Sequence, residues 1–385
     1  MTSSKITALV VDDSSVIRGF ITRIIDKHDD IDVVGIAADG QMAIDMYNKH
    51  TPDVVVMDIE MPVMNGIEAL QKILDINPQA RIIICSTLSV KNADITMKAL
   101  RLGAADCIAK PTSAAEINSS EQFRSELITK ILSIGNRPRS LRLHDKKIDS
   151  KASGTETLDT KPMKPEIKET GTNSAPVTQA PNRKKDIEIR PLPIGLISPK
   201  IICIGSSTGG PQALFDVIKH LNKVSVPIVI TQHMPPTFTN MLAKHISMHT
   251  DLPCHEGEEN MRVEPGHGYV APGGFHMVFE KHGTGLRIKL LDTPPENFCK
   301  PSVDPMFKSA VEIYGNRVLG IMLTGMGHDG LDGSRILVEK GNRLIAQDKE
   351  TSVVWGMPGA VAHEGLCHEI LPLQDIGPKI RTIVQ

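Results

Sequence analysis

Short apolar runs alternate with amphipathic segments over the first third of the chain. The apolar runs lie at residues 6–11, 33–37, 54–57, 81–85 and 107–109. Between two of them, apolar residues recur at helical spacing, as at Ile67, Leu70, Ile73 and Leu74. Strands that alternate with helices in this way predict an α/β domain over residues 1–134, with a parallel sheet covered by helices on both faces.

The same alternation of strand-like and helix-like segments returns over residues 196–385. Strand-like runs occur at 201–204, 227–231, 269–271, 286–290, 318–323 and 343–346, and helix-like runs occur at 212–221, 238–249, 303–314 and 330–339. We therefore predict a second α/β domain with a parallel sheet and a β-hairpin insertion near residues 269–291.

The segment between the two domains, residues 135–195, has a different composition. Most of it reads KIDSKASGTETLDTKPMKPEIKETGTNSAPVTQAPNRKKD, which is rich in Lys, Thr, Ser, Pro and Glu and has almost no apolar periodicity. Such a segment buries too little surface to offset its ordering entropy, so we predict a flexible linker. The excess of basic residues in this segment leaves one alternative open, in which the segment is an arm that docks on a partner.

Composition narrows the class of protein. With 385 residues the expectation is two domains, and a formal net charge of −2 gives no reason to expect nucleic acid or an anionic membrane as a partner. No signal-like N-terminus and no run of about 20 apolar residues is present, so we expect a cytoplasmic protein without membrane insertion. The six cysteines form no C-x-x-C pair, which argues against a zinc site and a disulfide framework.

Charged and hydroxyl side chains follow four of the five strands predicted in the first domain. Asp12 and Asp13 follow the first strand, Asp58 the third, Ser86 ends the fourth, and Lys110 follows the last. The carboxyl ends of parallel strands meet at one edge, and clustered carboxylates there suit Mg²⁺. This arrangement predicts phosphoryl transfer to Asp58.

Each of these aspartates also has a simpler interpretation. Asp12 or Asp13 could cap the following helix, because Asp is a favoured N-cap residue, and Asp58 could be an ordinary loop residue. Four such positions at successive strand ends favour the phosphoryl-transfer site over these alternatives.

The second domain opens with IGSSTGGPQAL, in which Gly205-Ser206-Ser207-Thr208-Gly209 separates a strand from a helix. A phosphate-binding loop would require Lys-Ser/Thr where Pro211-Gln212 stands, and a dinucleotide loop would require glycine at Ser207. The pattern G-x-S-x-G fits a tight turn that exposes a nucleophilic serine, with Pro211 suited to the first helical turn. A purely structural glycine turn remains the alternative.

A nucleophilic serine requires a base and an orienting carboxylate. His233 ends the next strand and should reach the same sheet edge, whereas His245, His249, His255 and His328 are weaker candidates. Asp329 follows the strand at 318–323 within LTGMGHDGLDGS, with Asp332 as the alternative. Along this chain the candidate residues occur in the order Ser, His, Asp, whereas in α/β-hydrolases the order is Ser, Asp, His. The difference predicts a catalytic triad built independently, on a different sheet.

The first domain resembles the receiver domain of two-component response regulators, through VVDDS, DVVVMDIEMPVMNGIEAL, CSTLS and AKP. The resemblance implies a flavodoxin-like fold with Asp58 as the phospho-acceptor. It implies that Asp12, Asp13, Asp58 and the Glu60 carbonyl bind Mg²⁺, and that Ser86 and Lys110 form the phosphorylation switch. It also implies a cis peptide before Pro111, while Thr87, adjacent to Ser86, leaves the switch assignment open by one position.

The second domain resembles the catalytic domain of the CheB family of protein-glutamate methylesterases, through GSSTGGPQAL, QHMPPTFT, PGHGYVAPGGFHM, PSVDPMF and LTGMGHDG. The resemblance implies that Ser207 rather than Ser206 is the nucleophile, His233 the base, Asp329 the orienting carboxylate and the Met326 N–H an oxyanion donor.

The same resemblance implies a monomeric, phosphorylation-activated hydrolase. Its expected substrates are glutamate methyl esters and glutamines of methyl-accepting chemotaxis receptors, and its expected phosphodonor is a CheA-type histidine kinase. It implies Mg²⁺ for phosphorylation and no cofactor for ester hydrolysis.

Two rival functions are weighed against this one. A DNA-binding response regulator would need a helix-turn-helix with a basic recognition helix after the receiver, and the second domain shows none. A phospho-signalling scaffold that keeps the hydrolase fold without turnover is the other rival, and methanol release from a methylated receptor would separate it from an enzyme.

Overall fold

The computed structural model describes residues 5–111, 121–136, 187–192, 195, 197–222, 224–283 and 285–384. Residues 137–186, most of the predicted linker, lie outside this description, so the linker remains a prediction. Within the described residues, no helix combines the length and the apolar character needed to cross a membrane.

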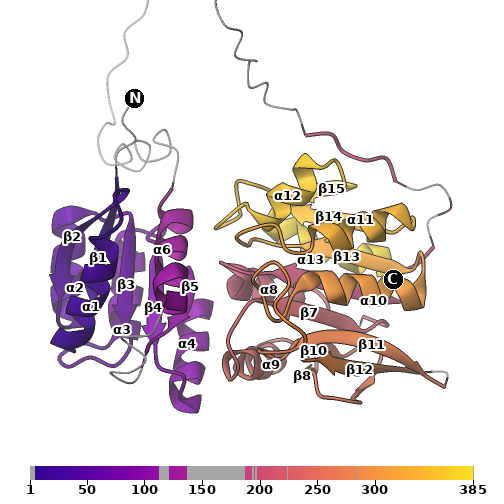
Figure 1. Ribbon diagram of the computed structural model, residues 1–385, viewed down its shortest axis with the longest axis horizontal. Helices are drawn as coiled ribbons and strands as arrows, with labels where there is room; N and C mark the ends of the chain where they lie inside the picture. The colour runs from indigo at the N-terminus through magenta and orange to yellow at the C-terminus, as the bar shows by residue number, and fades with distance from the viewer. Residues whose placement is uncertain are drawn as a thin grey trace, which may run out of the picture. The chain divides into compact units, whose positions relative to one another are not determined.

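The first domain contains a five-stranded parallel sheet in the order β2-β1-β3-β4-β5, as expected for a flavodoxin-like receiver (Figure 1). Its strands are β1 (Ile6–Val11), β2 (Ile31–Ala37), β3 (Val54–Asp58), β4 (Ile82–Ser86) and β5 (Asp106–Ala109). Its helices are α1 (Ser15–Ile25), α2 (Gly40–His50), α3 (Gly66–Ile76), α4 (Val90–Leu102) and α6 (Glu121–Gly135).

Alternation along the strands builds the two faces of this sheet. Val10 and Val56 pack in one cluster with side chains of α1 and α6, whereas Leu9 and Val55 pack in another with side chains of α2, α3 and α4. Both faces are apolar because successive side chains of a strand point to opposite sides, each covered by helices. The central strands therefore read as continuous hydrophobic runs.

The second domain contains a seven-stranded parallel sheet in the order β15-β14-β13-β6-β7-β10-β8. Its strands are β6 (Ile201–Ser206), β7 (Ile228–Gln232), β8 (Cys254–Glu256), β10 (Gly268–Val270), β13 (Val318–Met322), β14 (Arg343–Gln347) and β15 (Glu369–Leu371). Its helices are α8 (Gly210–Ile218), α9 (Phe238–His249), α10 (Val303–Tyr314), α11 (Leu331–Glu339), α12 (Met357–His363) and α13 (Leu373–Val384).

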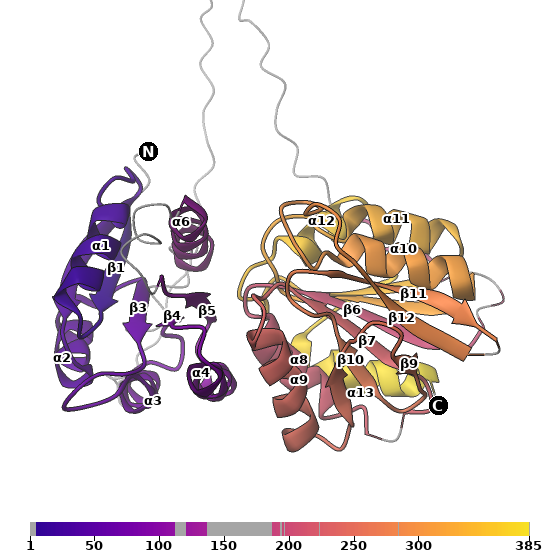
Figure 2. The same cartoon turned by 60° about the horizontal axis from the view of Figure 1, so that its bottom comes forward.

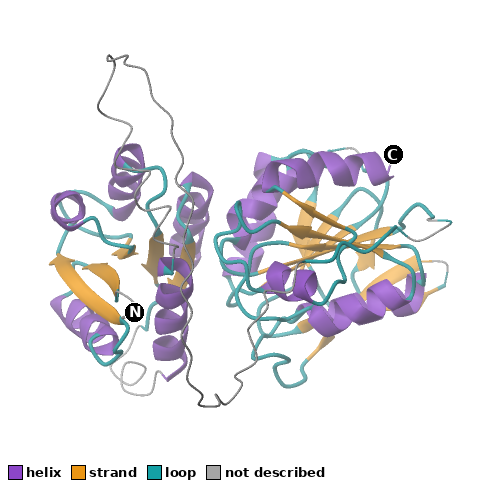
Figure 3. Ribbon diagram, turned by 90° about the horizontal axis from the view of Figure 1, so that it is seen from above, coloured by secondary structure: helices purple, strands orange, loops and turns teal. Residues whose placement is uncertain are grey.

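Helices cover both faces of the second sheet (Figure 2). Side chains of α8, α9 and α13 pack against one set of strand residues, including Ile204 and Ile230. Side chains of α10, α11 and α12 pack against the alternate set, including Cys203 and Val229. The helical layers flanking each sheet are also visible in Figure 3.

The predicted hairpin insertion is present, within narrower limits. Strands β11 (His276–His282) and β12 (Gly285–Leu291) pair antiparallel, and β9 (Arg262–Val263) extends them to three strands. Residues 268–270, at the edge of the predicted insertion, instead form β10 and join the parallel sheet between β7 and β8.

The strand order places a topological switch point in each sheet. In the first sheet the chain leaves β1 for β2 on one side and later returns to β3 on the other. In the second it proceeds from β6 to β7 and later crosses to β13 on the opposite side of β6. Ligand sites in open α/β sheets lie at the carboxyl ends of strands beside such points, and the predicted site residues follow these strands.

Candidate active site

The turn after β6 presents Ser207 at the carboxyl edge of the second sheet. The Ser207 N–H donates to the Thr324 carbonyl at 3.1 Å, and the Ser207 carbonyl accepts from the Gly210 N–H at 2.7 Å. Gly209 has φ +76°, a conformation that favours glycine, and α8 begins at the next residue. The G-x-S-x-G pattern therefore forms a tight strand-to-helix turn with a partly exposed serine at its centre.

Gln232, at the end of β7, clasps this turn. The buried Ser206 hydroxyl donates to Gln232 Oε1 at 2.7 Å, and Gln232 Nε2 donates to the Ser207 carbonyl at 2.9 Å. A β-carbon on Gly210 would lie 2.0 Å from Gln232 Oε1, so any larger residue there would displace the Gln232 amide. Because the Ser206 hydroxyl is buried and engaged, Ser207 is the serine of the pair that is open to solvent.

His233 follows β7 directly and meets Asp329 from the loop between β13 and α11. Its Nε2 lies 2.8 Å from Asp329 Oδ2. Asp329 is 2% exposed. Burial raises the pKa of its carboxyl group, but hydrogen bonds, first that from His233, outweigh burial and hold the pKa below its usual range. Asp329 is therefore a buried carboxylate that orients the imidazole.

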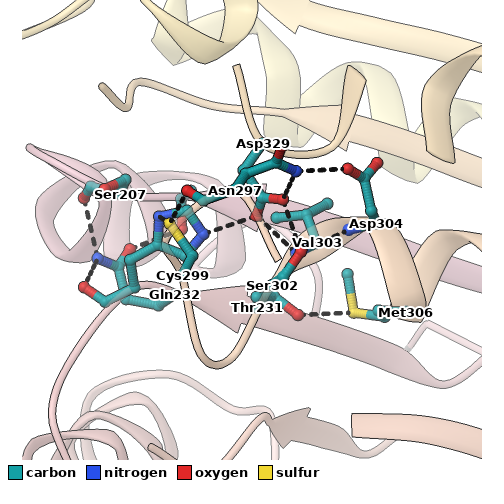
Figure 4. A network of polar contacts seen from close by, with 12 residues as sticks. Ser207, Thr231, Gln232, Asn297, Cys299, Ser302, Val303, Asp304, Met306 and Asp329 are labelled. Carbon is teal, nitrogen blue, oxygen red and sulfur yellow. Dashed lines mark hydrogen bonds and ion pairs between the residues drawn. The ribbon is translucent and has the colours of Figure 1, made fainter. Parts of the chain in front are cut away.

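Three further donors surround Asp329, and the sequence reasoning did not find them. Oδ1 accepts from the Ser302 hydroxyl at 2.6 Å and from Asn297 Nδ2 at 2.9 Å, and Oδ2 accepts from the Val303 N–H at 2.7 Å (Figure 4). Ser302 is also the N-cap of α10, and its hydroxyl accepts from the Asp304 N–H. The Ser-x-Asp start of a helix in PSVDPMF was a signal for the cap, not for its contact with Asp329.

Asp304 forms a second buried carboxylate beside this network. Asn297 Nδ2 donates to Asp304 Oδ2 at 2.8 Å as well as to Asp329, so one amide bridges both carboxylates. Burial raises the pKa of Asp304. The bridge holds the loop that carries residues 297–299 against the site.

The other ring nitrogen of His233 faces Cys299. Cys299 Sγ lies 3.4 Å from His233 Nδ1. Burial lowers the pKa of His233, but hydrogen bonds to Asp329 and Cys299 outweigh it and raise the pKa to about 10. Within the described part of the chain, no hydrogen bond joins the Ser207 hydroxyl to His233. The structure thus brings His233 to Asp329 and to Cys299, which the sequence did not single out.

The loop at 325–327 lies against the serine turn. A β-carbon on Gly325 would lie 2.9 Å from the Ser207 β-carbon, and Gly327 has φ +82°. Among the described residues, the Met326 N–H has no hydrogen-bond partner. An unpaired N–H beside the serine is the feature that an oxyanion-binding site requires.

The alternative residues lie elsewhere. His245 and His249 are on α9 and His255 is on β8, while His328 is exposed beside Asp329. Asp332 forms an ion pair with Arg335 on the surface of α11. None of them forms a hydrogen bond with Ser207 or His233 in the described residues.

The carboxyl edge of the first sheet gathers a second group of charged residues. Lys110 Nζ lies 2.6 Å from Asp12 Oδ2 and 2.8 Å from Asp58 Oδ2. Burial raises the pKa of Asp58 against the lowering effect of Lys110, and the two carboxylates raise the pKa of Lys110 against the lowering effect of burial. Lys110 therefore balances two buried carboxylates.

The donor set at this edge suits a hard divalent cation. Asp12, Asp13 and Asp58 each offer a carboxylate oxygen, all within 4.8 Å of one another, and Asp13 is exposed. Oxygen ligands of this kind fit Mg²⁺. Neither Asp12 nor Asp13 caps α1: the cap is Ser14, whose own N–H donates to Asp12 Oδ1 at 2.9 Å.

The remaining predicted residues of this domain are near the same edge. Ser86 is buried at the end of β4, and its hydroxyl lies 3.5 Å from the Thr87 carbonyl rather than bonding Asp58. The Glu60 side chain contacts Lys91 and Asn92. The cis peptide bond recorded among the described residues precedes Pro301, so the expectation of one before Pro111 is not met.

Comparison with known proteins covers both domains. The family model described as CheB methylesterase matches residues 202–380, and the model described as response regulator receiver domain matches residues 8–120.

Three curated relatives match almost the whole chain. A protein-glutamate methylesterase/protein-glutamine glutaminase from Azospirillum brasilense is 44% identical over 382 residues, which cover 98% of this chain and 92% of the relative. The enzyme of that name from the group 2 operon of Rhodospirillum centenum is 44% identical over 385 residues, covering 99% and 94%. One from Rhodospirillum rubrum is 43% identical over 374 residues, covering 96% and 93%.

Proposed function

The chain belongs to the CheB methylesterase family, and we propose that it hydrolyses glutamate γ-methyl esters on the cytoplasmic helices of chemotaxis receptors, releasing methanol. A glutamine side chain has the same shape with an amide in place of the ester, so deamidation of receptor glutamines is the second activity. The single observation that carries the proposal is the 2.8 Å contact of His233 with Asp329 at the sheet edge where Ser207 is exposed.

The proposed mechanism is nucleophilic. Ser207 Oγ attacks the ester carbonyl, its proton passes to His233, and the oxyanion is stabilised by the Met326 N–H. The proton then passes from His233 to the departing methoxide, which leaves as methanol. Water, activated by His233, hydrolyses the acyl-enzyme and restores Ser207 and a glutamate.

The hydrogen bonds of His233 decide which nitrogen is the base. Nε2 is engaged with Asp329, so Nδ1 is the atom that would take the serine proton. Nδ1 is in contact with Cys299 Sγ, and that contact has to be released before Ser207 can reach it. The arrangement is consistent with a resting enzyme rather than a Michaelis complex.

The first domain supplies control. Asp58 is proposed to accept a phosphoryl group from a CheA-type histidine kinase, with Mg²⁺ held by Asp12, Asp13 and Asp58 and with the Glu60 carbonyl as a further ligand. The cation would neutralise phosphate charge during transfer. Lys110 would contact the phosphoryl oxygens, and Ser86 would move towards them, so that phosphorylation raises esterase activity.

Methanol release from methylated receptor tests the proposal, with and without acetyl phosphate as phosphodonor. We expect the phosphodonor to increase the rate and Ser207→Ala to abolish methanol release while leaving phosphorylation intact. Ser225→Ala, an exposed serine of the same domain, is the matched control and should behave as the native chain. Full esterase activity in Ser207→Ala would reject the assignment.

A further inference from the structure

Cys299 and His233 place a sulfur and a nitrogen ligand side by side. Sγ lies 3.4 Å from Nδ1. In a tetrahedral zinc site, with Zn–S of about 2.3 Å and Zn–N of about 2.0–2.1 Å, the two ligand atoms lie roughly 3.6 Å apart. The pair is therefore spaced to within a few tenths of an ångström for binding one ion, without rearrangement of the backbone.

The surroundings of His233 match those of a metal-binding histidine. Such histidines usually donate the remaining ring N–H to a carboxylate, which fixes the tautomer and the ring orientation. Asp329 accepts from His233 Nε2 at 2.8 Å and is itself held by three further donors, from Asn297, Ser302 and Val303. In the neutral ring Nε2 carries the hydrogen, so the lone pair is on Nδ1, the nitrogen that faces the thiol.

The sulfur is held in place and is accessible. Cys299 and Glu296 exchange two backbone hydrogen bonds, of 2.8 and 3.1 Å, and the Asn297 amide ties the same loop to Asp304 and Asp329. Cys299 is partly exposed, whereas the other five cysteines of the chain are buried. A cation from solvent can therefore reach this thiol and not the others.

We propose that Cys299 Sγ and His233 Nδ1 bind Zn²⁺ or another thiophilic divalent cation, with water completing the coordination, and that the bound ion inhibits the enzyme. The thiol proton is released to solvent as the S–metal bond forms. A protonated imidazole releases its Nδ1 proton to solvent as well, and the metal takes the Nδ1 lone pair that would accept the serine proton. Binding stands on the geometry of the pair, while inhibition rests on the proposed function. Mg²⁺ prefers oxygen ligands and does not compete at this site.

The binding site can be tested without measuring activity. Co²⁺ is added to the full chain in excess Mg²⁺, which occupies the carboxylate cluster of the first domain. We expect a thiolate-to-cobalt charge-transfer band in the native chain and in His282→Gln, which removes an exposed histidine of the hairpin, and no band in Cys299→Ser. A native chain without the band, or a band that persists in Cys299→Ser, overturns the proposal.

A second measurement needs no variant. Zn²⁺ should slow alkylation of Cys299 by iodoacetamide in the native chain, as read by peptide mapping, and unchanged alkylation would contradict binding at the thiol. Inhibition is read from methanol release, each protein being compared with its own zinc-free rate. We expect Cys299→Ser to need at least about tenfold more zinc for half-inhibition than the native chain or His282→Gln.

Equal zinc sensitivity in Cys299→Ser would refute the inhibitory role. A chain that shows the cobalt band but hydrolyses no ester would retain the metal site and refute the proposed function instead, so the two failures are distinguishable.

Discussion

His233 is hydrogen-bonded through Nε2 to Asp329 at 2.8 Å, while its Nδ1 lies 3.4 Å from Cys299 Sγ. The ring is thus held between two loops, one after β13 and one before α10. One contact orients the imidazole, and the other occupies the nitrogen that catalysis requires.

Asp329→Asn should remove the orienting charge and favour the wrong tautomer of His233. We expect kcat for methanol release to fall by about 10⁴-fold, the loss typical of this change in serine-histidine-aspartate sites. Asp332→Asn, three residues further on and paired with Arg335 on the surface, is the control and should keep native kcat. A loss of less than tenfold in Asp329→Asn would show that His233 does not depend on this carboxylate.

The pH dependence of the reaction should report the two contacts of His233. With a pKa raised to about 10, the imidazole is protonated at neutral pH and cannot accept the serine proton, so kcat/KM should rise with pH along a limb above the ordinary histidine range. Cys299→Ala removes one of the interactions that raise the pKa and should move this limb to lower pH. A limb at the same pH in both proteins would contradict a role for the thiol.

Asp58→Asn should abolish phosphorylation by acetyl phosphate, because the acceptor carboxylate is gone. Intact-protein mass spectrometry would show a phosphoryl adduct on the native chain and none on the variant. Asp45→Asn, an exposed residue of α2, tests for a general effect of lost charge and should retain the adduct. Methanol release by Asp58→Asn should no longer respond to the phosphodonor, and a normal response would place the acceptor elsewhere.

Gly210→Ala should destabilise the second domain. The added carbon would lie 2.0 Å from Gln232 Oε1, so the clasp on Ser206 and Ser207 must open and leave buried polar groups unpaired. We expect a loss of about 1–3 kcal/mol in the free energy of unfolding, measured by urea denaturation. Gly285→Ala, with no atom nearer than 3.6 Å to its new carbon, should change stability far less; equal effects would argue against the clasp.

Much of the fold follows from local pattern. Strands that are buried on both faces appear in the sequence as apolar runs, and in the helices between them apolar residues recur at helical spacing. Residue spacing therefore predicts both α/β domains. The glycines and Pro211 of the serine turn also act locally, because backbone conformation there depends on the residues themselves. His233 and Asp329 are candidates because each follows a strand, and strand ends in a parallel sheet share an edge. Ser207 is the centre of G-x-S-x-G, and its choice over Ser206 also rests on the resemblance to the CheB family.

What the sequence determined is therefore which residues reach that edge; which of them touch was decided only by the tertiary structure. His233 and Cys299 are 66 residues apart and His233 and Asp329 are 96 apart, and no local period relates them. The contacts arise because β6 lies between β7 and β13, which brings three loops to one point, and because buried Asp329 needs donors from Asn297, Ser302 and Val303. Side-chain hydrogen bonding of a buried charge depends on what the fold packs around it, and for that reason Cys299 and Gln232 emerged only from the structure.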